Sequence, residues 1–351
     1  MIIYKKNLKF YIGILLILLL ASCGAPTPNV DKSDHFNGEV FHNLDESELH
    51  KSFKDFLKWR FYSKRKDWPD WVDIDQQNIK SNKVKDGEII ITFINHATML
   101  IQIDGVNIVT DPIYSKRSSP FSFIGPKRVK LPGIKFDDLP KIDIILISHN
   151  HYDSFDKKTL DDLVKRDNPY ILFGIGNANY LKNKTDKSIE MDWGDKIKLN
   201  KIEFTFLPAK HWSKRTLFDT NKSLWGSFSI IGSKKIYFAG DTGYSDHFKK
   251  IANDFDGFDL SLIPIGAYEP RWFMKYAHMN PQESVLAHID LRSKKSIAMH
   301  FGTFQLTNEA INDPIIDLKK AMQDLKIDKD DFIILKNGQS FKNGDNTNSN
   351  L

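Results

Sequence analysis

The segment "IDIILISHNHYDS", residues 142–154, joins a strongly apolar run to a cluster of polar side chains. The run Ile142–Ile147 has the composition of a strand that is covered on both faces. An extended backbone places alternate side chains on the same side, so His149, His151 and Asp153 can converge on one cavity. Imidazole nitrogens and carboxylate oxygens are ligands that zinc accepts. The segment therefore predicts part of a metal site at the end of a buried strand.

One short segment cannot complete a coordination shell, so the missing ligands must come from the ends of other strands. Three residues follow predicted strands in this way: His211 after 202–209, Asp241 after 235–239, and His300 after 296–299. A lone histidine after a strand is usually a surface or capping residue, and an aspartate in a G-D-x-G sequence is usually a turn residue. Their occurrence at successive strand ends favours one shared site, because loops at strand ends often hold functional residues.

Two blocks of predicted strands organise the rest of the chain. Short, β-branched segments begin at Gly87, and a second strand-rich block spans about residues 188–240. Helices are predicted at residues 45–64, 156–166, 247–255, 281–289 and 313–325. Asp45 and Glu48 are placed to cap the first of these helices. Strand-rich blocks that are each followed by helices indicate an α/β fold, a β-sandwich with helices outside it.

The first 23 residues have the pattern of an export signal. Lysines precede the apolar run Tyr11–Leu20, which is shorter than the roughly 20 residues needed to span a bilayer. Cys23, the only cysteine of the chain, follows Leu20-Ala21-Ser22, an ending that resembles a bacterial lipobox. We expect a lipoprotein anchored through acylated Cys23 to a membrane and facing outside the cytoplasm, in the periplasm or on the outer membrane. An uncleaved anchor or an ordinary signal peptide is the alternative.

The predicted organisation is a signal segment at residues 1–22, a linker at 23–44, one domain at 45–342 and a disordered tail at 343–351. The formal charge of the whole chain is +5, and three lysines of the signal segment contribute to it. Without those lysines the chain is close to neutral, which argues against a nucleic acid as partner.

The motifs at the strand ends carry a resemblance to a known superfamily. The set "SHNHYD", "AKHW", "FAGDTG" and "MHFGT" resembles the metallo-β-lactamase superfamily, which implies an αββα sandwich with metals at one edge. Three longer stretches narrow the resemblance from the superfamily to one family: "NHATMLIQIDGVNIVTDPIYSKRSSPFSFIGPKRV" (95–129), "LPAKHWSKR" (207–215) and "AHMNPQES" (277–284). They resemble the family of the N-acylphosphatidylethanolamine-hydrolysing phospholipase D, over about residues 55–335.

The resemblance implies two zinc ions, the first held mainly by imidazoles and the second by a carboxylate and an imidazole, with one bridging carboxylate. The implied ligands are His149, His151 and His211 for the first ion, Asp153 and His300 for the second, and Asp241 between them. Asp153 and Asp241 are the implied catalytic residues.

One position departs from the pattern of the superfamily. In H-x-H-x-D-H the last histidine is also a ligand of the second metal, and this chain has Ser154 there. A neutral hydroxyl is a poor zinc ligand beside imidazole. We therefore expect a second metal that is held more weakly, or one that tolerates oxygen ligands better than zinc does.

Three further residues match family positions less specifically, and a fourth has only a local interpretation. Tyr152 and His278 match residues that contact substrate, although Tyr152 can equally be a packed aromatic and His278 a polar residue before a helix. His96 in "NHATML" is interpreted as a residue that orients a loop or supports a metal ligand. Asp111 in "VTDP" is interpreted as a turn residue before a proline.

The resemblance implies a zinc-dependent phosphodiesterase that releases N-acylethanolamine and phosphatidic acid from a phospholipid, with the membrane and a second copy of the chain as partners. Fold does not fix substrate, so a lactonase or another metal-dependent hydrolase of a soluble, phosphorylated substrate is the first alternative. A lipid-binding lipoprotein that lost its activity with the change to Ser154 is the second.

Overall fold

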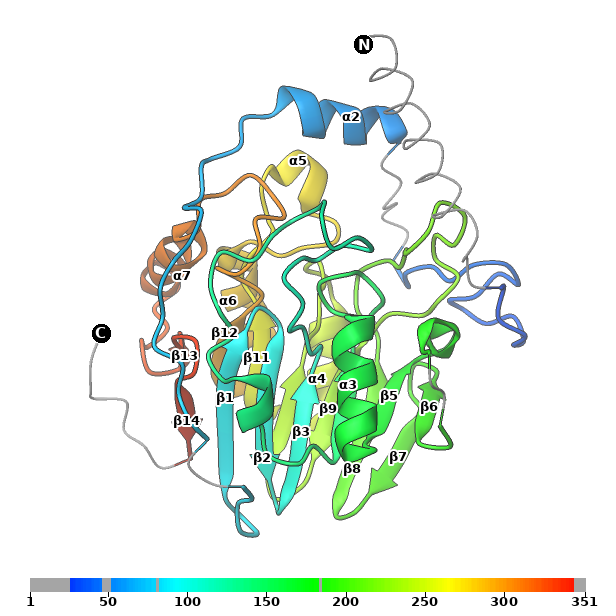
Figure 1. Cartoon of the computed structure of the whole chain (residues 1–351), viewed down its shortest axis with the longest axis vertical. Coiled ribbons are helices and arrows are strands. Elements are labelled where there is room, and N and C mark those ends of the chain that lie inside the picture. Colours follow the sequence, from blue (N-terminus) through cyan, green and yellow to red (C-terminus); the bar gives the residue numbers. More distant parts are fainter. Residues whose placement is uncertain (1–25, 46–51, 80–81, 183–184, 344–351) are drawn as a thin grey trace, which may run out of the picture.

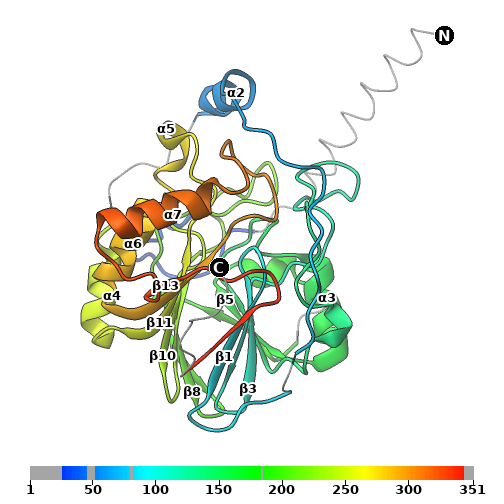
Figure 2. The ribbon, with the colours of Figure 1, turned by 90° about the vertical axis from the view of Figure 1, so that its left-hand side faces the viewer.

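The computed structural model describes residues 26–45, 52–79, 82–182 and 185–343. Two mixed β-sheets of seven strands each pack face to face, and helices cover their outer faces (Figures 1 and 2). Figure 2 shows α3 on one side of the paired sheets and α4, α6 and α7 on the other. The predicted αββα sandwich is therefore confirmed.

The first sheet has the strand order β14-β1-β2-β3-β4-β5-β6. Its strands are β1 (Ile89–Asn95), β2 (Thr98–Ile103), β3 (Val106–Thr110), β4 (Ile144–Ile147), β5 (Tyr170–Gly174), β6 (Ser188–Met191) and β14 (Ser340–Lys342). Strands β3 to β6 are parallel to one another. All four residues of β4 are fully buried, as expected of a central parallel strand with both faces covered.

The second sheet has the order β13-β12-β11-β10-β9-β8-β7. Its strands are β7 (Lys196–Leu199), β8 (Ile202–Leu207), β9 (Ser227–Ile231), β10 (Lys235–Phe238), β11 (Phe258–Pro264), β12 (Ser293–Met299) and β13 (Phe332–Ile333). Strand β9 is antiparallel to both β8 and β10, so β8 and β10 run in the same direction. Strands β10 to β13 are parallel, which brings the carboxyl ends of β8, β10 and β12 to one edge.

Helices lie where the sequence predicts them at 156–166, 247–255, 281–289 and 313–325, whereas the short helix Arg271–Met274 was not predicted. The helices are α2 (Phe53–Tyr62), α3 (Lys157–Asp167), α4 (His247–Phe255), α5 (Arg271–Met274), α6 (Pro281–Asp290) and α7 (Asp313–Asp324), with short 3-10 turns at Phe136–Asp138 and Asn177–Tyr180. Leu160 and Leu163 of α3 share an apolar cluster with Ile145 and Ile171 of the first sheet. Figures 1 and 2 both place α2 and α5 at the same end of the sandwich.

Two local predictions differ from the structure. The helix expected at 45–64 is described only from Phe53, and its cap is Ser52, whose side chain forms a capping box with Asp55. Asp45 pairs instead with Lys210 at 2.6 Å, and Glu48 lies outside the described residues. The hydroxyl of Ser52 accepts from the N–H of Asp55, and the carboxylate of Asp55 accepts from the N–H of Ser52, so the cap of this helix is at Ser52 and not at Asp45.

The segment expected to be a linker packs on the sandwich where the structure describes it. Phe36 and Phe41 are both 1% exposed and belong to the main apolar core. The two residues pair across an isolated β-bridge. The free energy gained by burying two aromatic side chains exceeds the conformational entropy that a short segment loses when it packs, so the segment is ordered. The predicted signal segment, Cys23 and residues 344–351 lie outside the described residues. Within the described ranges, no helix combines the length and the apolar composition that crossing a bilayer requires.

Candidate metal centre

All six predicted ligands meet at one edge of the sandwich. His149 follows β4, His211 follows β8, Asp241 follows β10 and His300 follows β12 directly. These strands point their carboxyl ends to this edge, which explains why loops far apart in the sequence converge there. The donor atoms form three groups, each within 4.8 Å: His149, His151 and His211; His96, Asp153 and His300; and His211, Asp241 and His278.

Three imidazoles make up the first group. The Nε2 of His211 lies 3.2 Å from the Nδ1 of His151, and the rings of His149 and His211 meet edge to face at 4.6 Å. His149 and His211 are at most 1% exposed. Three neutral imidazole nitrogens at this spacing are a typical donor set for zinc.

Hydrogen bonds at Nδ1, on the side of the ring away from the site, orient the imidazoles of His149 and His211. The Ser148 hydroxyl donates to the Oδ2 of Asp111 at 2.6 Å, so it accepts from the Nδ1–H of His149 at 2.9 Å. The Nδ1–H of His211 donates to the carbonyl oxygen of Ala277 at 2.9 Å. Each contact fixes the tautomer of its ring and leaves the Nε2 lone pair turned toward the site.

The two carboxylates face His300. The Nε2 of His300 lies 3.2 Å from the Oδ2 of Asp153 and 3.0 Å from the Oδ2 of Asp241. The same oxygen of Asp241 is 3.7 Å from the Nε2 of His149. Asp241 therefore lies between the group of three histidines and His300.

The electrostatics of the site favour a cation. Burial lowers the pKa of His149 to about 3 and also lowers the pKa of His151 and His211, so these rings keep free lone pairs. Burial acts in the same way on His300, but the charge of Asp241 and hydrogen bonds with Asp153 and Asp241 prevail and raise its pKa to about 10. The carboxylates thus create a negative field in a buried place.

The donor atoms themselves fit divalent ions. The Nε2 of His149, the Oδ1 of Asp241 and the Nδ1 of His278 are buried and have no hydrogen-bond partner within the described ranges. Leaving such atoms unpaired costs free energy, which a bound cation would recover. Imidazole and carboxylate donors in this mixture suit zinc and related metals.

The two predicted substrate residues differ in their surroundings. The Nδ1 of His278 is 4.0 Å from the Oδ2 of Asp241, and burial lowers its pKa to about 4. His278 therefore presents a neutral ring to the site. Tyr152 is half-buried, and its hydroxyl donates to the backbone oxygen of Arg215, whose guanidinium lies 4.1 Å from the centre of the Tyr152 ring. Its observed contacts hold a loop in place, and contact with substrate remains a prediction.

Sequence reasoning missed three supporting residues. Asp111 is fully buried and supports His149 through Ser148, whereas "TDP" alone suggests only a turn. Arg215 is 6% exposed and donates from one nitrogen to the carbonyl oxygens of Asn150 and Phe155, each at 2.8 Å. These two acceptors lie at the ends of the segment 150–155, here called the ligand loop, which carries His151 and Asp153. Asn43 pairs with the backbone of His211. No local sequence signal distinguishes these residues from solvated ones.

Comparisons with known proteins show the family of the chain. The family model described as "Beta-lactamase superfamily domain" matches residues 106–301. The N-acyl-phosphatidylethanolamine-hydrolyzing phospholipase D 1 of Caenorhabditis elegans is 41% identical over 259 residues, 68% of this chain and 72% of the nematode protein. The mitochondrial enzyme of the same name from Saccharomyces cerevisiae is 34% identical over 245 residues, 67% of this chain and 52% of its own length.

A solved structure shows the same fold. A metallo hydrolase of the archaeon Ignicoccus hospitalis superposes with a TM-score of 0.55 at 21% identity, over 73% of this chain and 98% of the archaeal chain. At this identity the likeness concerns the fold alone.

Proposed function

The chain belongs to the metallo-β-lactamase superfamily and is a metal-dependent hydrolase, and from this premise we propose that it is a zinc-dependent phosphodiesterase of the N-acylphosphatidylethanolamine phospholipase D type. Water would add its oxygen to phosphorus, and the bond from phosphorus to the N-acylethanolamine oxygen would break. The leaving oxygen would take a proton, so the products are N-acylethanolamine and phosphatidic acid.

The observation that carries this proposal is a set of exposed apolar side chains on loops that start at the metal centre. In the loop 115–131, Phe123 and Ile124 are 66% and 54% exposed. The base of this loop bridges Arg128 to Phe304, whose ring lies 5.4 Å from the ring of His96. Large apolar side chains in water are costly, and a lipid substrate gives them a reason to be there.

Two other segments repeat this arrangement. Leu217 and Phe218 are 43% and 68% exposed and follow Arg215, which holds the ligand loop. Phe61 and Tyr62 at the end of α2 are 72% and 86% exposed. This helix packs on α5 through Trp59, whose ring stacks on Phe273 at 5.1 Å, at the end of the molecule where α5 lies (Figure 1). Apolar rims of this kind favour a substrate held in a membrane over a small soluble one.

The chain's own residues would divide the work at the site. His149, His151, His211 and Asp241 would hold one ion, and Asp153, His300 and Asp241 the other. When bound, the ions supply a water of lowered pKa and offset the charge that develops on phosphoryl oxygens. His278, neutral beside Asp241, can donate an N–H to a phosphoryl oxygen and so orient the phosphate.

A mixed-micelle assay with N-acylphosphatidylethanolamine tests the proposal. We expect release of N-acylethanolamine that stops with a chelator and returns with added zinc. Asp241→Asn should abolish turnover while the far-UV circular dichroism spectrum stays that of the wild type, because it removes one of the two charges that face His300. Absence of release together with rapid hydrolysis of a lactone or a soluble phosphodiester would replace this function by its first alternative.

We also propose that acylated Cys23 anchors the protein to a membrane outside the cytoplasm, which would bring the site to its lipid substrate. The small residues before Cys23 and the apolar run ahead of them support this. A cell grown with labelled palmitate should incorporate label into the wild type and not into Cys23→Ser. Equal labelling of the two would contradict the anchor.

A further inference from the structure

Ser154 leaves the second group of ligands one imidazole short of the superfamily pattern, and another histidine lies beside the same carboxylate. Ser154 is fully buried, while the Nε2 of His96 lies 3.0 Å from the Oδ2 of Asp153. We propose that His96 is a protein ligand of the second metal ion and takes the place of the histidine that Ser154 lacks. This inference rests on the metal centre of the proposed function and adds a ligand to that centre.

The spacing of the donor atoms fits one ion. His96, Asp153 and His300 each offer one atom, and these atoms lie within 4.8 Å of one another. The Nε2 atoms of His96 and His300 are 3.0 and 3.2 Å from the same oxygen of Asp153. Ligands held at 2.0–2.2 Å around a tetrahedral zinc ion are separated by roughly 3.4 Å. With Asp241, the set offers two imidazoles and two carboxylates, which completes a four-coordinate shell.

The fold holds His96 firmly in this position. His96 occupies the turn between β1 and β2 with φ of 49°, a conformation that is uncommon for residues other than glycine. Its N–H donates to the hydroxyl of Thr303 at 3.1 Å, and its carbonyl accepts from the N–H of His300 at 2.8 Å. These bonds tie His96 to the loop that carries His300. A strained backbone is retained where several contacts impose it, as is frequent at functional sites.

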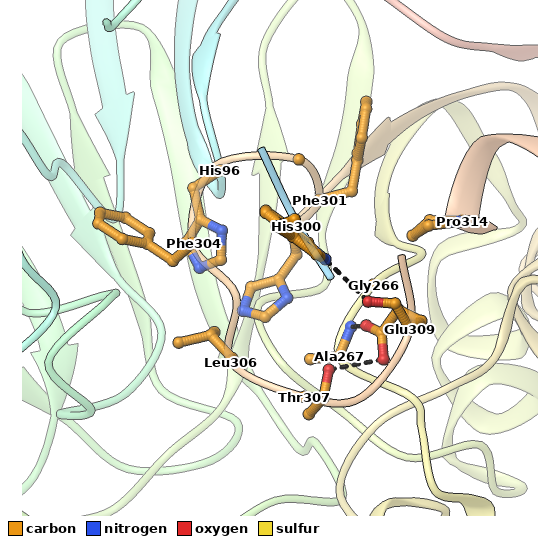
Figure 3. A pocket seen from close by; sticks show the side chains of 12 residues that line it. His96, Gly266, Ala267, His300, Phe301, Phe304, Leu306, Thr307, Glu309 and Pro314 are labelled. Atoms are coloured by element: carbon orange, nitrogen blue, oxygen red, sulfur yellow. Dashed lines mark hydrogen bonds between the residues drawn. The ribbon is translucent and has the colours of Figure 1, made fainter. Parts of the chain in front are cut away.

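The backbone hydrogen bond between His96 and His300 also brings their imidazole rings together. The ring centres of His96 and His300 are 4.0 Å apart, and the edge of His96 meets Phe304 at 5.4 Å. Figure 3 shows the two imidazoles next to each other in the wall of a pocket, with Phe304 flanking His96. His96 is only 2% exposed. An imidazole fixed in this way needs little further ordering to bind an ion, which favours tight binding.

Counting the ligands decides what the proposal changes. With Asp153, Asp241 and His300 alone, the second ion would have three protein ligands, as we expected from the sequence. With His96 it has four, so Ser154 does not by itself imply a weak second site. The fourth ligand is then an imidazole from the turn between β1 and β2, in place of the imidazole that the superfamily pattern has at position 154.

Metal binding without substrate provides the test. Metal-free protein is titrated with Zn²⁺ in competition with a chromophoric chelator. The wild type should bind two ions, and His96→Ala should keep the first and bind the second at least 100-fold more weakly. The matched control is His288→Ala, because His288 is also a buried histidine, hydrogen-bonded to Ser296 on another part of the fold. It should bind both ions as the wild type does.

A second measurement separates a ligand from a residue that only supports Asp153. In wild-type protein loaded with Co²⁺, the Nδ1–H of a coordinated His96 gives a strongly shifted proton NMR signal, which a residue bonded only to Asp153 does not give. This measurement needs no variant, so it decides the matter even where His96→Ala does not fold.

The double variant His96→Ala/Ser154→His should regain affinity for the second ion, because it restores the pattern of the superfamily. Two ions bound with wild-type affinity by His96→Ala, or the absence of the shifted His96 signal, would overturn the proposal. Two ions and a shifted signal in a protein that leaves N-acylphosphatidylethanolamine intact would uphold the ligand and remove only the proposed substrate.

Discussion

The side-chain amide of Asn43 pairs with both backbone groups of His211. Its Nδ2 donates to the carbonyl oxygen of His211, and its Oδ1 accepts from the N–H of His211, each at 3.0 Å. A second contact joins the same two segments, because the carboxylate of Asp45 forms an ion pair with Lys210 at 2.6 Å. The segment before the sandwich is therefore fastened to the strand end that presents one of the predicted ligands.

Replacing Asn43 should loosen this attachment. Asn43→Ala removes two hydrogen bonds to the backbone of His211 and one from the indole N–H of Trp225, and we expect a loss of about 1–3 kcal/mol in the free energy of unfolding. Urea denaturation of the metal-free protein measures it. The control is Asn37→Ala, since Asn37 accepts only from its own exposed turn. An equal loss in the two variants would contradict a specific role for Asn43.

Removing Asp111 should weaken the first metal ion. In Asp111→Ala the hydroxyl of Ser148 loses its acceptor and no longer fixes the tautomer of His149. Supporting contacts of this kind contribute about 10- to 100-fold to metal affinity, so we expect a loss in that range by chelator competition. Asp104→Ala serves as the control, because Asp104 is also a buried carboxylate, at 8% exposed, but accepts from the backbone N–H groups of Gly87 and Ser233 away from the site. Unchanged zinc affinity in Asp111→Ala would refute the relay.

Arg215 should determine the shape of the ligand loop. Arg215→Met keeps the apolar stem and removes the donors to Asn150 and Phe155, so the loop between them loses its fixed ends. We expect a drop in thermal stability together with a lower affinity for the first zinc ion. Arg166→Met is matched to it, since Arg166 donates to the carbonyl oxygens of Phe136 and Pro140 away from the site. That control should lose stability without losing zinc affinity, and a parallel loss of affinity would argue against a local effect.

The apolar rim should matter only for a substrate in a lipid surface. The double variant Phe123→Ser/Phe218→Ser removes two exposed aromatic rings from separate loops. We expect at least a tenfold lower rate with N-acylphosphatidylethanolamine in vesicles and an unchanged rate with a short-chain, soluble phosphodiester. Both rates are measured on one preparation. An equal fall with both substrates would show that the rings support the fold and not the membrane contact.

The attachment of the leading segment should depend on pH through His35. Its Nε2 lies 2.7 Å from Asp192 and its Nδ1 2.6 Å from Asp34. Burial opposes the charged form of His35, but the two carboxylates prevail and raise its pKa above 6.5. Burial likewise opposes the charged form of Asp192, but hydrogen bonds from His35 and from the N–H of Trp193 prevail and lower its pKa below 3.8. Because the raised group is the histidine, its stabilisation is complete below pH 6.5 and is lost as the pH rises through the raised value.

The measurement is the free energy of unfolding of the wild type and of His35→Gln at several pH values. The difference between the two should be largest between about pH 4 and pH 6.5 and should shrink in more alkaline buffer. Asp192→Asn removes the other half of the same pair and should show the same dependence. A difference that stays constant from pH 5 to pH 9 would rule out the ion pair as its cause.

Most elements of the fold could be predicted because their signals are local. The buried strand before His149 and the helix at His247–Phe255 follow from apolar periodicity over a few residues. The capped helix near the start was placed too early, since Asp45 has the right residue type for a cap but is engaged by Lys210. The segment around Phe36 and Phe41 resembled a linker because its polar composition conceals two aromatic anchors.

The alternation expected of His149, His151 and Asp153 was wrong, because residues 151–154 form a turn in which the N–H groups of Ser154 and Phe155 donate to the carbonyl oxygen of His151. The sequence by itself determined which strands end beside the six predicted ligands, because apolar runs and the motifs that follow them are properties of short segments. Tertiary structure alone decided which further residues surround them. His96 meets Asp153 across 57 positions of the chain, and Asn43 meets His211 across 168. Such contacts arise when the two sheets pack and their strand ends and turns meet at one edge. The motif "NHATML" marks His96 as a supporting residue, but no local pattern names the residue that it contacts.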